Sequence, residues 1–494
     1  MSGLNSGPLK MKAMTGKFLL IVAATLSGWL TCGPATAQSP PAPSSVRDAN
    51  PTLDWSKLDQ EALDYFRHYL QFDTSDPPGD TAAAVAYLKG ILEQAGIACR
   101  TFSSEPGKTS LLAKIPGPAA LKPFLMMSHA DVVPAAAAQW SHQPFSAELS
   151  DGYVWARGAI DNKAHGIMAL MTMLVFKRYQ IPLRRGLEMM VNPEEEVGGE
   201  KGAQWMVANH WDAIDPAFAV NEGGSGRPNL LGMTGVAFQI AIAEKRVMWL
   251  RLTAHGHAGH GSVPRADNPN LILIEALARL LAEQPAVRLT SFVRGSMKTI
   301  APRLDPPANS ELLDLDQPAQ LQLALKGPLS DDTIQATLRD TISPTMLNAG
   351  LKVNVIPSTA EAALDCRLLP GTAPEAFLDR MRKLLNDSRI VIDYIQRPDS
   401  PPPSPDSGEA WDAITKVVAT DFPGALVVPT MTTGGTDSRF LRDKGVPAYG
   451  FIPIILDENE ARRFHGVDER LSLENLDRGI RATYDLAHEL CAAH

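Results

Sequence analysis

The chain has 494 residues, of which 45% are hydrophobic and 20% are charged, so there is ample apolar material to bury a core and disorder throughout is excluded. The formal net charge is −9, and an acidic chain is a poor nucleic-acid binder because phosphate contacts need clustered Lys and Arg. At about 150 residues per domain, the length corresponds to about three domain-sized units.

A targeting segment is predicted at the N-terminus. Lysines precede an apolar run at residues 18–30 that is too short to span a membrane, and Ala35-Thr36-Ala37 resembles a signal-peptidase site. We therefore expect a signal peptide at 1–37, a linker at 38–49, and export to a periplasm or the medium with no stable membrane anchor after cleavage. A lipoprotein anchor at Cys32 is the alternative, but no small residue directly precedes this cysteine.

Strands and helices alternate over residues 50–241, the predicted first part of a catalytic domain. Apolar residues at helical spacing predict helices and short apolar runs predict strands. In chain order these are helices 61–70 and 81–95, strands 111–115 and 124–127, helix 163–179, strand 186–191, helix 202–210 and strand 217–220. The alternation predicts the α/β class, with a mostly parallel central sheet covered by helices on both faces.

A separate small α/β unit is predicted over residues 242–397. Its expected elements are strand 247–254, helix 270–282, two strand halves within 351–367, helix 375–386 and strand 390–395. This β-α-β-β-α-β order is ferredoxin-like. Residues 295–345 are rich in Pro, Asp and Ser and are expected to be an insertion in it. Residues 398–494 return to helix and strand and are expected to complete the catalytic domain.

Histidines and carboxylates follow the predicted strands or stand in glycine-containing segments. Taken singly, each has an ordinary structural interpretation, such as a hydrogen-bonded histidine, a solvated face or a turn. Sites in parallel sheets form outside the carboxyl ends of the strands, and imidazole with carboxylate suits zinc or a similar divalent ion. The joint pattern therefore indicates a metal site among His129, Asp131, Asp161, Glu195, Glu196, Glu222 and His465.

Short motifs in a specific order carry a family resemblance. They include Ser-His-Ala-Asp-Val-Val-Pro from Ser128, Pro-Glu-Glu-Glu-Val-Gly-Gly from Pro193, Gly-His-Gly-Ser from Gly259 and His-Gly-Val-Asp-Glu from His465. The chain resembles the di-zinc amidohydrolases and peptidases, namely aminoacylase, glutamate carboxypeptidase, carnosine dipeptidase and succinyl-diaminopimelate desuccinylase. It is most similar to the Gly-X carboxypeptidase and N-acyl-amino-acid hydrolase branch.

The resemblance implies two divalent metal ions. Zn²⁺ is the expected metal, and Co²⁺ and Mn²⁺ are the alternatives. Asp161 would bind both ions, His129 and Glu222 would complete one site, and Glu196 and His465 would complete the other. The family often has Asp-Glu-Gly where this chain has Asn-Glu-Gly at residues 221–223, so a neighbour of the expected ligand differs, not the ligand itself.

The resemblance also implies catalytic and substrate-binding roles. Glu195 would be the general base for the attacking water, and Asp131 would orient His129. His260, from the inserted unit, would donate to the oxyanion. The expected substrate contacts are Asn354, Arg367, Arg439, Gly434 and Gly435.

The implied activity is hydrolysis of an amide or peptide bond next to a free carboxylate, in a small peptide or an N-acyl amino acid. Residues 242–397 would form a lid of the dimerisation type, which implies a homodimer. A dipeptidase or a deacylase of the same family is an alternative, and so is an inactive homologue, although neither Glu195 nor a ligand is lost. A serine hydrolase is disfavoured because no Gly-x-Ser-x-Gly elbow follows a strand. A separate metal site at His255, His257 and His260 is the rival interpretation of that cluster.

Overall fold

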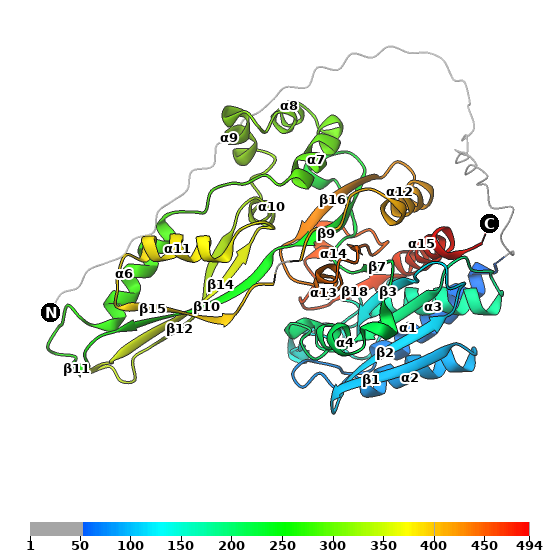
Figure 1. Ribbon diagram of the computed structural model, residues 1–494, viewed down its shortest axis with the longest axis horizontal. Helices are drawn as coiled ribbons and strands as arrows, with labels where there is room; N and C mark the ends of the chain where they lie inside the picture. The colour runs from blue at the N-terminus through cyan, green and yellow to red at the C-terminus, as the bar shows by residue number, and fades with distance from the viewer. Residues whose placement is uncertain (1–52, 400, 494) are drawn as a thin grey trace, which may run out of the picture. The chain divides into compact units, whose positions relative to one another are not determined.

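The computed structural model describes residues 53–399 and 401–493 (Figure 1). The predicted signal peptide, the linker and Cys32 lie outside the described residues. Within them, no helix is both long enough and apolar enough to cross a membrane.

The largest sheet of the described residues follows the order β1-β2-β6-β3-β7-β17-β9-β16, with β8 paired to β9. The pairs β6–β3, β3–β7, β7–β17 and β9–β16 are parallel. Its strands are β1 (Ala98–Glu105), β2 (Lys108–Ile115), β6 (Leu187–Asn192), β3 (Phe124–His129), β7 (Phe218–Asn221), β17 (Ala448–Gly450), β9 (Val236–Glu244), β16 (Leu426–Thr432) and β8 (Gly226–Pro228).

Helices cover both faces of this sheet. Successive side chains of β3 point to opposite faces, so their contacts show which helices pack on each face. Phe124 and Met126 share one core with α1 (Trp55–Leu70), α2 (Ala82–Gln94), α3 (Lys163–Arg178), α12 (Glu409–Asp421) and α15 (Leu473–Cys491). Leu125 and Met127 share another core with α4 (Ala203–Asn209), α5 (Trp211–Ile214) and α13 (Ser438–Asp443). The predicted α/β class, with a mostly parallel sheet between helices, is confirmed.

A second, antiparallel sheet has the order β12-β14-β10-β15 and its own core with two helices. The elements are β10 (Arg246–His255), α6 (Pro269–Ala282), β12 (Thr341–Ala349), β14 (Thr359–Leu368), α11 (Pro374–Leu385) and β15 (Ile390–Gln396). The order of elements is the predicted one. Strands flank Pro357 as predicted, namely β13 (Val355–Ile356) and β14, but β13 pairs with β11 (Gly259–His260) and is not part of this sheet. The strand paired with β14 is β12, an edge strand whose register shifts after Pro344, as proline in a sheet requires.

Four helices between α6 and β12 form a segment that we call the helical insertion, residues 291–337. Its helices are α7 (Ser291–Ile300), α8 (Ala308–Leu313), α9 (Pro318–Lys326) and α10 (Asp332–Thr337). Phe292, Ile300 and Leu312 belong to the core of the large sheet and not to that of the second sheet. The shorter elements are β4 (Glu148–Ser150), β5 (Tyr153–Trp155), β11 (Gly259–His260), β13 (Val355–Ile356), α14 (Glu458–Ala461) and β18 (Arg470–Ser472).

Candidate metal centre

The candidate site lies at the carboxyl ends of β6, β3 and β7, which are neighbours in the sheet and run parallel. His129 is the last residue of β3, Glu196 lies in the turn after β6, and Glu222 directly follows β7. Asp161 comes from the segment before α3, and His465 comes from the loop between α14 and β18. Parallel register therefore places at one edge side chains that lie far apart in the sequence.

The two histidines approach Asp161 from different sides. His129 Nε2 lies 3.2 Å from Asp161 Oδ1 and 3.4 Å from Glu222 Oε2. His465 Nε2 lies 3.0 Å from Asp161 Oδ2 and 3.0 Å from Glu196 Oε2. Asp161 thus offers one oxygen to each of two imidazole–carboxylate pairs, which is the arrangement that a carboxylate shared by two cations requires.

The carboxylates of the cluster are short of positive charge. Burial, reinforced by the nearby Glu222, raises the pKa of Glu195 well above its ordinary value. Burial likewise raises the pKa of Glu196 and of Glu222. Glu196 Oε1 is buried and has no hydrogen-bond partner among the described residues.

The histidines respond to the same excess of negative charge. Asp161 and Glu196 raise the pKa of His465 to about 10. Burial opposes protonation of His129, but Glu222, Asp131 and Asp161 together outweigh it and raise its pKa well above 6.5. A group of acids that draws protons in this way suits divalent cations, which would take the place of the protons. The residues present therefore fit a metal site. Ligand atoms of His129 with Glu195 and Glu222, and of His129 with Asp161 and Glu196, form two groups, each within 4.8 Å.

Asp131 holds the site in two ways. His129 Nδ1 donates to the Asp131 carbonyl at 2.9 Å, which leaves Nε2 facing Asp161 and Glu222. The Asp131 carboxylate accepts from the backbone N–H groups of Glu195 (3.2 Å) and Glu196 (3.0 Å). His129 Nδ1 thus bonds to the Asp131 carbonyl and has the carboxylate Oδ1 at 3.6 Å, while the same carboxylate fixes the turn that carries the two glutamates.

Two residues without a predicted role also shape the site. Glu469 is fully buried and accepts from Arg157 Nη1 (2.7 Å) and from the backbone N–H groups of residues 158, 160 and 161 (3.0, 2.7 and 3.0 Å). It therefore fixes the segment that presents Asp161. Asn162 donates to Glu222 Oε2 at 2.9 Å and accepts from the His129 N–H at 3.1 Å. The only sequence signal for Glu469 was its place in the His-Gly-Val-Asp-Glu motif.

The backbone at the cluster is left-handed at two non-glycine positions. Glu194, next to the predicted base, has φ 69°, and His465 has φ 57°. Such a conformation costs about 1–3 kcal/mol and persists where the surrounding contacts hold it. The strained residues are thus His465 itself and the residue directly before Glu195, and the side chains of His465 and Glu195 both line the cluster.

A cavity of about 540 Å³ opens onto the cluster and is lined by Asp161, Glu195, Glu196, Glu222 and His465. Cavities of about 300–1,000 Å³ bind small molecules in proteins. The predicted substrate-contact residues Gly434 and Gly435 line it. Arg227, which sequence analysis did not single out, is the only arginine or lysine among the described residues of its lining.

The other predicted contacts do not line this cavity. His260 lies exposed in β11, hydrogen-bonded to Ser262 Oγ at 2.7 Å, and Asn354 is also exposed. Arg367 pairs with Asp365 at 2.6 Å. No group of potential metal ligands among the described residues contains His255, His257 or His260.

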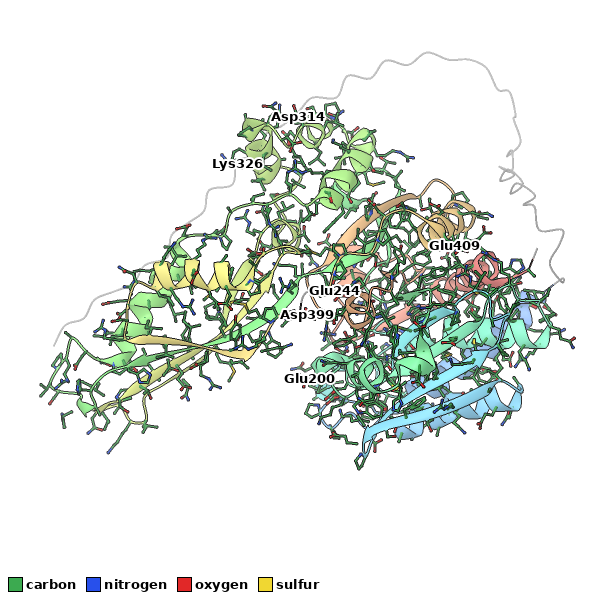
Figure 2. The ribbon with its side chains drawn as sticks, in the orientation of Figure 1. Glu200, Glu244, Asp314, Lys326, Asp399 and Glu409 are labelled. Carbon is green, nitrogen blue, oxygen red and sulfur yellow. The ribbon has the colours of Figure 1, made fainter. Side chains whose placement is uncertain are left out.

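Arg439 is held by its own chain next to the Gly434-Gly435 turn. It donates to the Gly198 carbonyl at 2.5 Å, and it pairs with Asp399 at 3.3 Å. Glu244 at the end of β9, labelled with Asp399 in Figure 2, pairs with Arg442 of α13 at 2.5 Å. Arg439 also donates to the carbonyl of Thr436 at 3.3 Å, and the Thr436 hydroxyl donates to Glu244, so both arginines act on the residue that follows this turn.

The family model described as peptidase family M20/M25/M40 matches residues 125–489. The chain belongs to this family. The M20 chain is 28% identical over 423 residues to aminoacylase-1 of Sus scrofa, covering 84% of this chain and 91% of that protein. It is 30% identical over 364 residues to the N-fatty-acyl-amino acid synthase/hydrolase of Xenopus tropicalis, covering 72% and 70%.

The fold of the M20 chain is shared with solved structures. An M20 family metallo-carboxypeptidase from Sulfolobus solfataricus superposes with a TM-score of 0.67 at 19% sequence identity, covering 87% of this chain and 99% of that chain. The predicted resemblance to the aminoacylase and carboxypeptidase family is therefore confirmed. The M20 chain is a hydrolase of the metallopeptidase and amidohydrolase type.

Proposed function

We propose that the protein hydrolyses the amide bond of N-acyl amino acids or small peptides, beside a free carboxylate, with two divalent ions bound at the candidate metal centre. Asp161 carries the proposal, because its two oxygens face His129 and His465 separately. The similarity to aminoacylase-1 of Sus scrofa supports an acyl-amino-acid substrate, and the similarity to the Sulfolobus solfataricus metallo-carboxypeptidase supports a peptide. Zn²⁺ is the proposed metal, because imidazole and carboxylate ligands suit it.

The metal ions would supply Lewis acidity at the scissile carbonyl and lower the pKa of the attacking water. Glu195 is placed to accept the proton of that water, since its side chain lines the cavity beside the ligands and Asp131 holds its backbone N–H. The same carboxyl would return the proton to the leaving amine.

We propose export of the protein, a homodimer through the lid at residues 242–397, and an oxyanion contact from His260. His260 is exposed and its Nδ1 is hydrogen-bonded to Ser262, so a substrate or a second copy of the chain would meet Nε2.

A substrate panel with matched metal analysis tests the proposed function. The purified protein, loaded with Zn²⁺, Co²⁺ or Mn²⁺, is assayed on N-acetyl amino acids and on dipeptides. We expect turnover that a chelator abolishes and added metal restores. Full activity of the chelated, metal-free protein would exclude the mechanism, and the ratio of the two substrate classes separates an amidohydrolase from a peptidase.

A further inference from the structure

The helical insertion contributes to the cavity that opens onto the metal centre. Val293, Met297 and Ile300 of α7 and Ile334 of α10 line it, facing a lining that includes Val428 and Met431 of β16. These six side chains are apolar. Four of the five expected metal ligands, all but His129, line the same cavity, so a substrate bound at the centre has an apolar surface within reach.

This apolar wall is fixed to the catalytic sheet. Ser296 Oγ donates to the Pro429 carbonyl of β16 and to the Phe292 carbonyl at 3.0 Å, so α7 is tied to the strand that it covers. The Asp331 side chain caps α10, accepting from the N–H groups of Thr333 (2.9 Å) and Ile334 (3.2 Å). The wall is therefore part of a built pocket.

The apolar wall favours an aliphatic group of the substrate over a peptide extension. A peptide extension brings backbone N–H and C=O groups, which are costly to bury without partners. Three hydroxyl residues of the insertion also line the cavity, namely Ser296, Thr333 and Thr337. The hydroxyls of Ser296 and Thr337 already donate to carbonyl groups within the protein. An aliphatic chain needs no such partners and gains about fourfold in binding for each methylene that it buries.

We propose that the helical insertion forms an acyl-chain subsite, in which Met297, Ile300 and Ile334 pack against an aliphatic acyl group longer than acetyl. The inference rests on the proposed function and deepens it by naming the substrate class. Met297 and Ile334 are half-buried, so they are the positions where a change is best tolerated.

The test compares two amides of one amino acid, N-acetyl-methionine and N-octanoyl-methionine, on the metal-loaded full chain. We expect kcat/KM to rise with chain length, and the octanoyl-to-acetyl ratio to fall about tenfold in Met297→Ser and in Ile334→Ser. Leu323→Ser is the matched control, since Leu323 lies in the same insertion, is 52% exposed and does not line the cavity. Its ratio should equal that of the wild type.

A binding measurement separates this inference from the proposed function. Calorimetry should show octanoate binding the metal-loaded protein more tightly than acetate, with the difference reduced in Ile334→Ser. Octanoate binding without hydrolysis of any N-acyl amino acid would leave the subsite standing and overturn the proposed function. No preference for octanoate over acetate, or an octanoyl-to-acetyl ratio that both variants leave unchanged, would overturn the subsite.

Discussion

Replacing Glu469 with Gln tests how the protein fixes its metal-binding segment. In the wild type, Oε1 accepts two backbone N–H groups and Oε2 accepts Arg157 Nη1 and the Gly158 N–H. Glutamine keeps one acceptor oxygen, so two of the four donors would meet an amide NH₂ group. A buried donor without an acceptor costs about 1–3 kcal/mol, and a buried ion pair that loses one partner costs about 3–5 kcal/mol. We therefore expect Glu469→Gln to lose about 3–5 kcal/mol of unfolding free energy.

The assay is urea unfolding of the metal-free protein, with Glu61→Gln as the matched control. Glu61 also pairs with an arginine, Arg178, at 2.5 Å, but its side chain is 28% exposed, and exposed pairs are worth about 0–1 kcal/mol. Glu469→Gln should also weaken Zn²⁺ binding, because the backbone N–H of Asp161 is one of the groups that Glu469 holds. Equal losses in the two variants would refute the reasoning.

Three further predictions follow from the cavity and the buried charges. Arg227→Met should raise KM for N-acetyl-methionine more than KM for its uncharged carboxamide, because Arg227 is the only arginine or lysine among the described cavity residues. Arg478→Gln is the control, since Arg478 lies outside this cavity, and it should change neither KM. Burial raises the pKa of Glu188 to about 7, so the fold favours its protonated form, and this stability is complete below the ordinary value of 4.5 and lost as pH rises through about 7. Between pH 4.5 and about 7, the unfolding free energy from urea titrations should therefore fall less in Glu188→Gln than in the wild type. Parallel pH profiles of the two proteins would contradict the assignment. Metal removal should lower the melting temperature of the wild type, and much less that of Glu222→Gln, measured by calorimetry; equal shifts would place the metal elsewhere.

The position of the metal centre could be predicted because the sheet topology fixes it. Apolar runs indicate the strands before His129 and Glu222, and parallel strands end at one edge, so strand-end residues had to meet. Sheet topology does not reveal which residues hold the ligand-bearing segments in place. Glu469 accepts backbone N–H groups from a segment about 310 residues away, a contact with no local signal.

The arginines that were predicted to contact the substrate also show what the sequence alone does not determine. Arg367 and Arg439 are of the right type for a carboxylate, but Asp365 and Asp399 already pair with them. Sequence reveals which side chains can bind an anion, whereas the fold decides which of them an internal acid neutralises. Arg227 stands in a short strand with no motif, and only the cavity singles it out.

Residues 295–345 were predicted as an insertion, but the helices within them were missed, and their last residues belong to β12. Pro and Asp are common in loops, whereas several of those in this segment begin helices. Pro318 occupies the first position of α9, where its missing N–H is no loss, and Asp331 caps α10. The same residue types favour loops and helix starts, and the distinction lies in the apolar residues that follow.

Glu195→Gln tests the central claim most directly, because Glu195 is the proposed base and the change is nearly isosteric. We expect the variant to retain two metal ions per chain by elemental analysis and to lose about 10²–10⁴-fold in kcat on N-acetyl-methionine, the range that general acid–base catalysis contributes. Wild-type turnover by a fully metal-loaded Glu195→Gln protein would contradict the account.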